Sequence, residues 1–368
     1  MTTYNANNER IKRKYYVYLK EAKRNSEPTV DAAAKALARF EIDTKHCDFK
    51  LFHIEQAISF KHRLLEQQSQ MTGEKLSKST VYATLTCLKC FFCWLAGQPG
   101  YKSRIQYSDA DYFNLSEKDM RVATTYHEQV GPTLEQAQHV ITVMPFGTAI
   151  ERRDRALVAF TLLTGARDSA IASVKLKHVN LVDGYLDQDA REVDTKFSKS
   201  FVTYFFPVGN DALQILVDWV SYLREEMLWG DDDPLFPSTR VGVSAELQFE
   251  VLGLERSNWS SAAPIRTIFQ DAFKNAGLPY FNPHSIRNTL VRLGLKVCKT
   301  PEEFKEWSQN LGHEKVLTTF QSYGKVDRPR QGQIIRALAS PQLAAGQADL
   351  AKLAKALMRE MRASCGMV

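Results

Sequence analysis

The chain has 368 residues, which is enough for about two domains of ordinary size. Hydrophobic residues make up 44% and charged residues 24%, proportions that are typical of a soluble globular protein, and the net charge of +6 allows a polyanionic partner without establishing one. Because there is no signal pattern and no apolar run long enough to cross a bilayer, we expect a cytoplasmic, nucleoid-associated protein.

The N-terminal segment is basic and aromatic. Its cations are interleaved with tyrosines, and the set comprises Arg10, Lys12, Arg13, Lys14, Tyr15, Tyr16, Tyr18, Lys20, Lys23 and Arg24. A charge run of this kind forms a solvated helix face at least as often as a phosphate-binding surface, and both interpretations stay open. After a break at residues 25–28, a helix is predicted over Thr29 to Phe40.

Two further predicted helices complete a small bundle. One spans about His53 to Gln68. The next begins at a serine cap, Ser77 or Ser79, and ends at Gly97. Its apolar residues recur at steps of four and three, at Val81, Leu85, Leu88, Phe92 and Leu95. The sequence therefore predicts a helical domain over residues 1–120 that holds no active site.

The last of these helices carries a CxxCxxC pattern, Cys87, Cys90 and Cys93, which raises the question of a zinc site. On a continuous helix each step of three residues slips back by about 60°, so the three sulfurs point in different directions. No second CxxC or paired histidine follows, so we favour reduced thiols over zinc. We expect no metal and no cofactor.

The polar stretch after the bundle contains a predicted linker, residues 121–131. Thr133 and Gln136 then form a capping-box pattern, which predicts a helix that runs to Met144. We expect the second domain to cover residues 132–340.

Early in the second domain, a helix is predicted over Asp154 to Leu163, and Gly165 ends it. Arg167 then stands at the start of the next helix, beside free backbone amides. Such an arginine can form an anion site, and the alternative is a salt-bridged arginine on the surface.

Strands are predicted at Tyr185–Leu186 and over Asp194 to Val208, where apolar and polar residues alternate. Lys196 and Lys199 flank the turn before the second strand, where isolated lysines are usually solvated. An amphipathic helix is predicted next, over Ala212 to Leu228.

The stretch from Pro283 to Tyr323 carries most of the predicted chemistry. His284 and Arg287 follow a proline, which suits the first turn of a helix, and side chains three residues apart on a helix share a face. His313 and Tyr323 lie in the second segment, LGHEKVLTTFQSYG. A phenol becomes a useful nucleophile when a base removes its proton and cations hold the group that it attacks. This set of side chains therefore suggests attack on a phosphodiester.

Six motifs, taken in the order in which they occur along the chain, resemble those of the tyrosine recombinase (phage integrase) family. They are TGAR at Arg167, DTKFSK, LFPS, PHSIR, LGH and the final Tyr323. The resemblance covers residues 133–325, and the helical domain is more weakly similar to the family's core-binding domain. It implies a mainly α fold with a small β-sheet, in which a helical-bundle core-binding domain and a mixed α/β catalytic domain form a C-shaped clamp on duplex DNA.

The resemblance also implies catalytic roles. Arg167 and Arg287 would hold the non-bridging oxygens of the scissile phosphate, and His313 would add a hydrogen bond there. His284 would assist removal of the proton from Tyr323. Tyr323 would then attack and leave a 3′-phosphotyrosyl link with a free 5′ hydroxyl.

Lys196 would complete the implied set by protonating the leaving 5′ oxygen. The sequence departs from the family pattern at two points. Ala170 stands where the family usually has a carboxylate, three residues after the first arginine, and the interval from His313 to Tyr323 is one residue longer than usual. The first departure concerns the support of the active site more than its chemistry.

The C-terminal segment, residues 341–368, is predicted to be a helix with an apolar stripe. The stripe consists of Leu350, Leu353, Leu357 and Met361. It could pack on its own domain or dock on a neighbouring protomer, as the tail often does in this family. The resemblance implies a homo-tetramer on double-stranded DNA, with possible accessory directionality or DNA-bending proteins.

We therefore expect a site-specific recombinase that cleaves and rejoins DNA, and specifically the integrase of a bacterial mobile element. One alternative is a type IB topoisomerase, which shares the tyrosine chemistry but relaxes DNA without exchanging partners. The other is a catalytically silent DNA-binding protein that keeps the clamp. A covalent protein–DNA adduct distinguishes an enzyme from the silent alternative.

Overall fold

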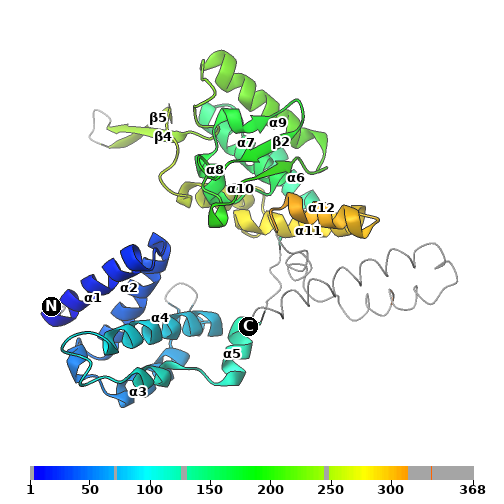
Figure 1. Cartoon of the computed structure of the whole chain (residues 1–368). Coiled ribbons are helices and arrows are strands. Elements are labelled where there is room, and N and C mark those ends of the chain that lie inside the picture. The colour runs from blue at the N-terminus through cyan, green and yellow to red at the C-terminus, as the bar shows by residue number, and fades with distance from the viewer. Residues whose placement is uncertain (1–3, 70–72, 126–130, 244–247, 314–332, 334–368) are drawn as a thin grey trace. The chain divides into compact units, whose positions relative to one another are not determined.

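The computed structural model (Figure 1) describes residues 4–69, 73–125, 131–243, 248–313 and 333. The chain divides into two compact units, residues 1–126 and 127–368, and each has its own cluster of buried hydrophobic side chains. The named strands of the described residues all lie in the second unit. The fold is therefore mainly α with small sheets, as expected from the sequence.

The first unit is a helical bundle. Its α-helices are α1 (Ala6–Val17), α2 (Glu27–Asp43), α3 (Ile54–Glu66), α4 (Lys78–Ala96) and α5 (Glu117–Thr124). Shorter helical segments are the π-helical turn Tyr18–Ala22 and the 3₁₀ segments Phe49–Leu51 and Tyr107–Phe113. The last of these and α5 were not predicted, and α5 overlaps the start of the predicted linker. Side-chain caps support α5, since Ser116 accepts a hydrogen bond from the Asp119 backbone N–H.

The helix α4 packs at the centre of the bundle, against α2, α3 and α5. Ser77 accepts a hydrogen bond from the backbone N–H of Thr80 and Gly97 ends the helix, both as predicted. Among the described residues, α4 is the one helix long and apolar enough to cross a membrane, which corrects our expectation that no such run exists. Its apolar side supplies the bundle core, where Phe92 packs against Phe40, Phe52 and Phe113.

The basic N-terminal segment contributes to this core at two positions. Lys12 is 8% exposed, and its Nζ lies 2.5 Å from Glu41 and 2.6 Å from Glu9. Burial opposes the charged form, but the two carboxylates outweigh it and raise the pKa of Lys12. Tyr15 is also buried and packs edge-on against Phe91. Neither open interpretation, solvated face or phosphate contact, applies to these two residues.

The three cysteines of α4 differ in their surroundings. Cys87 and Cys93 are half-buried, whereas Cys90 is exposed. Burial raises the pKa of the Cys87 and Cys93 thiols, which favours their protonated form. In the part of the chain that the structure describes, no group of three or more histidine, cysteine or acidic side chains could hold a metal ion.

The second unit combines helices with two small sheets (Figure 1). Its α-helices are α6 (Leu134–Val143), α7 (Ala149–Thr164), α8 (Asp168–Ser173), α9 (Asn210–Ser221), α10 (Ala263–Asn275), α11 (Ile286–Val297) and α12 (Pro301–Asn310). The shorter segments are the 3₁₀ turns Leu176–His178, Lys196–Ser198 and Pro283–Ser285 and the π-helical turn Tyr222–Glu226, which extends α9. The predicted capping box of Thr133 and Gln136 begins α6.

Three strands form an antiparallel sheet in the order β1 (Val179–Asn180), β2 (Tyr185–Gln188) and β3 (Phe201–Tyr204). The predicted strand from Asp194 to Val208 is therefore shorter than expected, because its first part contains a 3₁₀ turn. A separate hairpin, β4 (Ser238–Val243) with β5 (Phe249–Glu255), was not predicted. Its base is held by buried Arg153, whose Nη1 donates to Thr239 Oγ1 at 2.9 Å.

The central helix of the second unit is α7, in which every residue from Ala156 to Thr164 is buried. It begins at a capping box of Thr148 and Glu151, earlier than the predicted start at Asp154. Because both faces pack into the core, the end of α7 is fixed within the unit. The residues that follow it form the first part of the candidate active site.

Candidate active site

Arg167 lies at the N-cap position of α8, just after the turn that ends α7. Gly165 adopts a left-handed conformation there, with φ at +59°, and a Cβ on it would approach Leu290 Cδ1 to 2.9 Å. Within the described residues, no hydrogen bond or ion pair engages the Arg167 side chain, and burial lowers its pKa. The neighbouring Asp168 pairs instead with Arg266, at 2.7 Å. The surface salt bridge considered as the alternative is therefore absent among these residues.

A capped turn presents His284. The Asn282 side chain accepts a hydrogen bond from the Ser285 backbone N–H at 3.0 Å, and Pro283 opens the 3₁₀ turn. The helix α11 continues directly from Ile286. His284 and the arginine three residues later thus occupy the first turns of one helical segment, as predicted.

Arg287 is the most deeply buried member of the set, with 5% of its surface exposed. Its Nη1 donates to the Gly165 carbonyl at 2.7 Å, and its Nη2 donates to the Leu311 carbonyl and to His313 Nε2, the latter at 3.0 Å. Burial and the charge of Arg167 lower the pKa of Arg287 to about 9, which still leaves the guanidinium charged at neutral pH. One side chain therefore joins the ends of α7 and α12.

The surroundings of both histidines favour the neutral imidazole. Burial, and after it the charges of Arg287 and Arg167, lower the pKa of His284. The same causes lower the pKa of His313 to about 3. Because arginine can only donate, His313 Nε2 accepts from Arg287, and Nδ1 carries the ring proton. His284 can therefore accept a proton, while His313 can donate a hydrogen bond.

Lys196 opens the 3₁₀ turn between β2 and β3. Its charge also lowers the pKa of His284, with a smaller effect than burial and the two arginines, so it acts on the same site. Two serines of α8 hold the backbone just before it, since Ser169 and Ser173 both bond to Asp194. These serines were not predicted, although a spacing of four residues places both hydroxyls on one helix face.

The chain enters the second unit against the segment that carries His284. Thr289 Oγ1 donates to the Pro132 carbonyl at 2.5 Å. A Cβ on Gly131 would approach the Ser285 carbonyl oxygen to 2.5 Å, so this close contact requires glycine. The last residue of the predicted linker therefore lies against the turn that presents His284, and the residue after it bonds α11.

The structure brings five of the six predicted catalytic residues together: Arg167, Lys196, His284, Arg287 and His313. Tyr323 lies outside the described residues. Ala170 is 1% exposed and packs in the core, so its methyl group cannot replace the usual carboxylate. The carboxylate whose charge does act on His284 is that of Asp168.

A family model described as "Phage integrase family" matches residues 132–330, which is more than half of the chain. The chain belongs to the phage integrase family. It is thus a tyrosine-type recombinase, an enzyme of the class that breaks and rejoins DNA strands. The family resemblance drawn from the order of the sequence motifs is confirmed.

Curated relatives of this phage integrase family member include two XerC proteins. "Tyrosine recombinase XerC" of Lactobacillus delbrueckii subsp. bulgaricus is 25% identical over 257 residues, which cover 70% of this chain and 76% of the relative. The XerC of Halalkalibacterium halodurans is 22% identical over 334 residues, which cover 88% of this chain and 94% of the relative. The similarity therefore extends beyond the catalytic segment into the N-terminal unit.

Two solved structures share the fold of this recombinase. One is the Tn1549 transposon integrase in complex with transposon right end DNA, with a TM-score of 0.56, 14% identity, and coverage of 90% of this chain and 99% of the other. The other is a lambda integrase dimer bound to a COC′ core site. Its TM-score is 0.55 at 14% identity, and the match covers 87% of this chain and 98% of the other. At 14% identity these two structures support the fold alone. The chemistry of the site is inferred from the residues of this chain.

Proposed function

We propose that this enzyme is a site-specific recombinase that acts through a 3′-phosphotyrosyl intermediate and serves as the integrase of a bacterial mobile element. The observation that carries the proposal is the pair of neighbouring guanidiniums, Arg167 and Arg287. Arg167 has no ionic partner among the described residues, and its charge acts on buried Arg287. A phosphodiester supplies the anion that this arrangement lacks.

The transition state places extra negative charge on the non-bridging oxygens of the scissile phosphate. Arg167 and Arg287 stabilise that charge, and His313 adds a hydrogen bond from Nδ1. Neutral His284 accepts the proton of the Tyr323 hydroxyl as the phenolic oxygen attacks phosphorus. Fixed donors of this kind need no reorganisation during the reaction, so they contribute to the rate and not only to binding.

The bond from phosphorus to the 5′ oxygen breaks as the new bond to Tyr323 forms. The leaving oxygen takes a proton from the Lys196 ammonium, since an alkoxide is a poor leaving group. The phosphotyrosyl ester retains the energy of the broken diester. A 5′ hydroxyl from a second DNA strand can therefore attack it and rejoin the backbone without a nucleotide cofactor.

A nicked suicide substrate tests this proposal, because loss of the short strand below the nick traps the covalent intermediate. We expect a protein–DNA adduct on a denaturing gel, with the protein on the 3′ phosphate and a free 5′ hydroxyl on the other side. An adduct that forms only at one sequence and leads to strand exchange indicates a recombinase. Relaxation of any supercoiled plasmid without exchange indicates the topoisomerase alternative, and binding without an adduct indicates the silent one.

Double-stranded DNA is the proposed partner, bound between the core-binding domain, residues 1–120, and the catalytic domain, residues 132–340, with residues 121–131 as the linker. The match to a tyrosine recombinase, XerC, extends into the N-terminal unit, which supports a part for this unit in the proposed recombinase. Solved structures of the same fold include the lambda integrase dimer on its core site. We further propose that the two domains form a clamp around DNA. Accessory DNA-bending or directionality proteins would assist the reaction, which would take place in the bacterial nucleoid.

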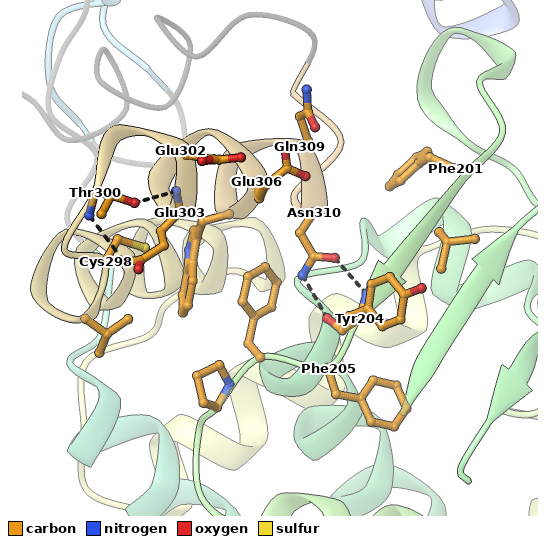
Figure 2. Close-up of a pocket in the computed structure, with 15 residues that line it drawn as sticks. Phe201, Tyr204, Phe205, Cys298, Thr300, Glu302, Glu303, Glu306, Gln309 and Asn310 are labelled. Atoms are coloured by element: carbon orange, nitrogen blue, oxygen red, sulfur yellow. Dashed lines mark hydrogen bonds between the residues drawn. The ribbon is translucent and has the colours of Figure 1, made fainter. Parts of the chain in front are cut away.

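A groove on the second unit supports assembly of several protomers on DNA. It has a volume of about 990 Å³ and lies between β3, the end of α11 and α12, as Figure 2 shows. Phe206 and Trp307 form apolar walls, and their rings lie 4.8 Å apart between centroids. Three exposed carboxylates, Glu302, Glu303 and Glu306, lie along its side.

The occupant that we propose is the C-terminal segment of a neighbouring protomer. That segment lies outside the described residues, but its sequence combines an apolar stripe with cations. Three of the cations, Lys352, Lys355 and Arg359, lie between the stripe residues Leu350 and Met361, and the fourth, Arg362, follows Met361. Apolar walls with an acidic side complement such a segment in both hydrophobicity and charge.

Ending the chain after Ser340 should spare binding to a single DNA site and prevent assembly of the four-protomer complex. The double substitution Glu302→Lys and Glu306→Lys should weaken assembly in the same way, because it repels the cationic segment. Sedimentation of protein–DNA complexes measures both, with Glu250→Lys on β5 as a matched charge reversal outside the groove. Complexes of unchanged size after truncation would show that the segment packs on its own domain.

A further inference from the structure

The short helix α8 is bonded to the backbone that leads into Lys196. Ser169 Oγ donates to the Asp194 carbonyl at 3.0 Å, and the Asp194 N–H donates to Ser173 Oγ at 2.8 Å. The hydroxyl hydrogen of Ser173 is directed to the Ala170 carbonyl, at 3.0 Å, which leaves its oxygen free to accept. Both polar groups of one peptide residue, Asp194, are therefore satisfied by two side chains of α8.

These bonds hold the backbone of a segment whose side chains are partly exposed. Val193 is 1% exposed and reaches the core, but Asp194 and Lys196 themselves are exposed. The Thr195 N–H donates to the Val193 carbonyl at 2.7 Å, so the chain turns tightly just before Lys196. Movement of Asp194 would consequently move Lys196, two residues further along.

The same helix also positions Arg167. Arg167 is its N-cap residue, two positions before Ser169, and Ala170 and Ile171 pack into the core of the second unit. The helix is thus a rigid base with a guanidinium at its start and two hydroxyls along one face. It therefore connects Arg167 to the backbone that leads into Lys196.

We propose that Ser169 and Ser173 are positioning residues that hold Lys196 at the leaving oxygen through the backbone of Asp194. This inference rests on the proposed role of Lys196 as the general acid. Proton transfer requires the ammonium and the leaving oxygen to approach hydrogen-bond distance as the bond breaks. A misplacement of about 1 Å can lower the rate of such a step by up to about 100-fold, although nothing that contacts the phosphate has changed.

The test is single-turnover cleavage of the nicked suicide substrate by the full chain, with oxygen or sulfur at the bridging 5′ position. A thiolate leaves without protonation, so sulfur removes the need for the acid. We expect the double variant Ser169→Ala and Ser173→Ala to cleave the oxygen substrate roughly 10- to 50-fold more slowly than the wild type. On the sulfur substrate it should cleave within about threefold of the wild type, since only the acid step depends on Lys196.

Matched variants separate this inference from the proposed function. Lys196→Ala should be slowed more than the serine variant and rescued by sulfur, whereas Lys199→Ala should be affected less. Ser238→Ala removes a hydroxyl at the start of β4 that bonds Ser257, just after β5, and it should behave as the wild type on both substrates. The two single serine variants and a thermal melt show whether the double variant remains folded.

Each remaining outcome decides one of the two claims. If sulfur does not rescue Lys196→Ala, Lys196 is not the acid, and the inference falls with that role. If sulfur rescues Lys196→Ala but leaves the serine variant slow, the serines act elsewhere in the site and the inference is wrong. It is equally wrong if the serine variant, folded, cleaves the oxygen substrate at the wild-type rate.

Discussion

Replacing Tyr323 with phenylalanine should abolish the covalent protein–DNA adduct while DNA affinity stays unchanged. The substitution removes one oxygen atom, the proposed nucleophile, and keeps the ring. No other group can form the same ester if Tyr323 is the attacking residue, so the loss should be complete rather than partial. A denaturing gel of the suicide substrate, with a binding titration in parallel, measures both properties.

Tyr280→Phe is the matched control for this experiment. Tyr280 is 47% exposed, and the charges of both Arg266 and Asp168 act on it, so it is a phenol near the site that an alternative mechanism could use. We expect this variant to form the adduct at the wild-type rate. An adduct that persists in Tyr323→Phe and disappears in Tyr280→Phe would assign the nucleophile to Tyr280 and overturn the alignment of the final motif.

Arg167→Ala should slow cleavage by roughly 100- to 1000-fold, the usual cost of losing a donor to transition-state charge. Thermal stability should be unchanged or higher, because the substitution removes a half-buried cation that has no ionic partner among the described residues. Bridging sulfur should not rescue this variant, since the charge missing at the non-bridging oxygens is still missing. Single-turnover rates on both substrates, together with a thermal melt, test all three expectations.

Arg224→Ala is a suitable control, because Arg224 is an exposed guanidinium paired with Asp231. It should cleave DNA at the wild-type rate. The pH dependence gives a further check on Arg167, whose charge lowers the pKa of His284. The proposed base works in its neutral form, above its pKa, so Arg167→Ala should raise that pKa and shift the acid limb of the rate profile to higher pH. A wild-type rate in a folded Arg167→Ala protein would remove Arg167 from the catalytic set.

Local signals in the sequence predicted much of the framework. The serine cap at Ser77, the capping box at Thr133 and the helix-ending Gly165 all lie where the structure has them. The turn before α11 also follows its proline as expected. These features were predictable because a cap or turn depends on residues within a few positions of it.

Elements without such local signals were missed or misplaced. The hairpin of β4 and β5 depends on buried Arg153, which lies 86 residues before its partner Thr239. Lys12 was expected at a solvated face or on phosphate and instead pairs with Glu41, 29 residues away. Their environments depend on which surfaces meet in the folded chain.

The sequence by itself determined the family, because six motifs in one order are specific even when each is common. Only the tertiary structure decided how the described catalytic side chains are held. Arg287 bonds the carbonyl of Gly165, 122 residues earlier, and the backbone of Asp194, just before Lys196, bonds two serines of another element. Motifs specify which groups are present, whereas burial and bonds between distant segments fix where they point and which protonation state they adopt.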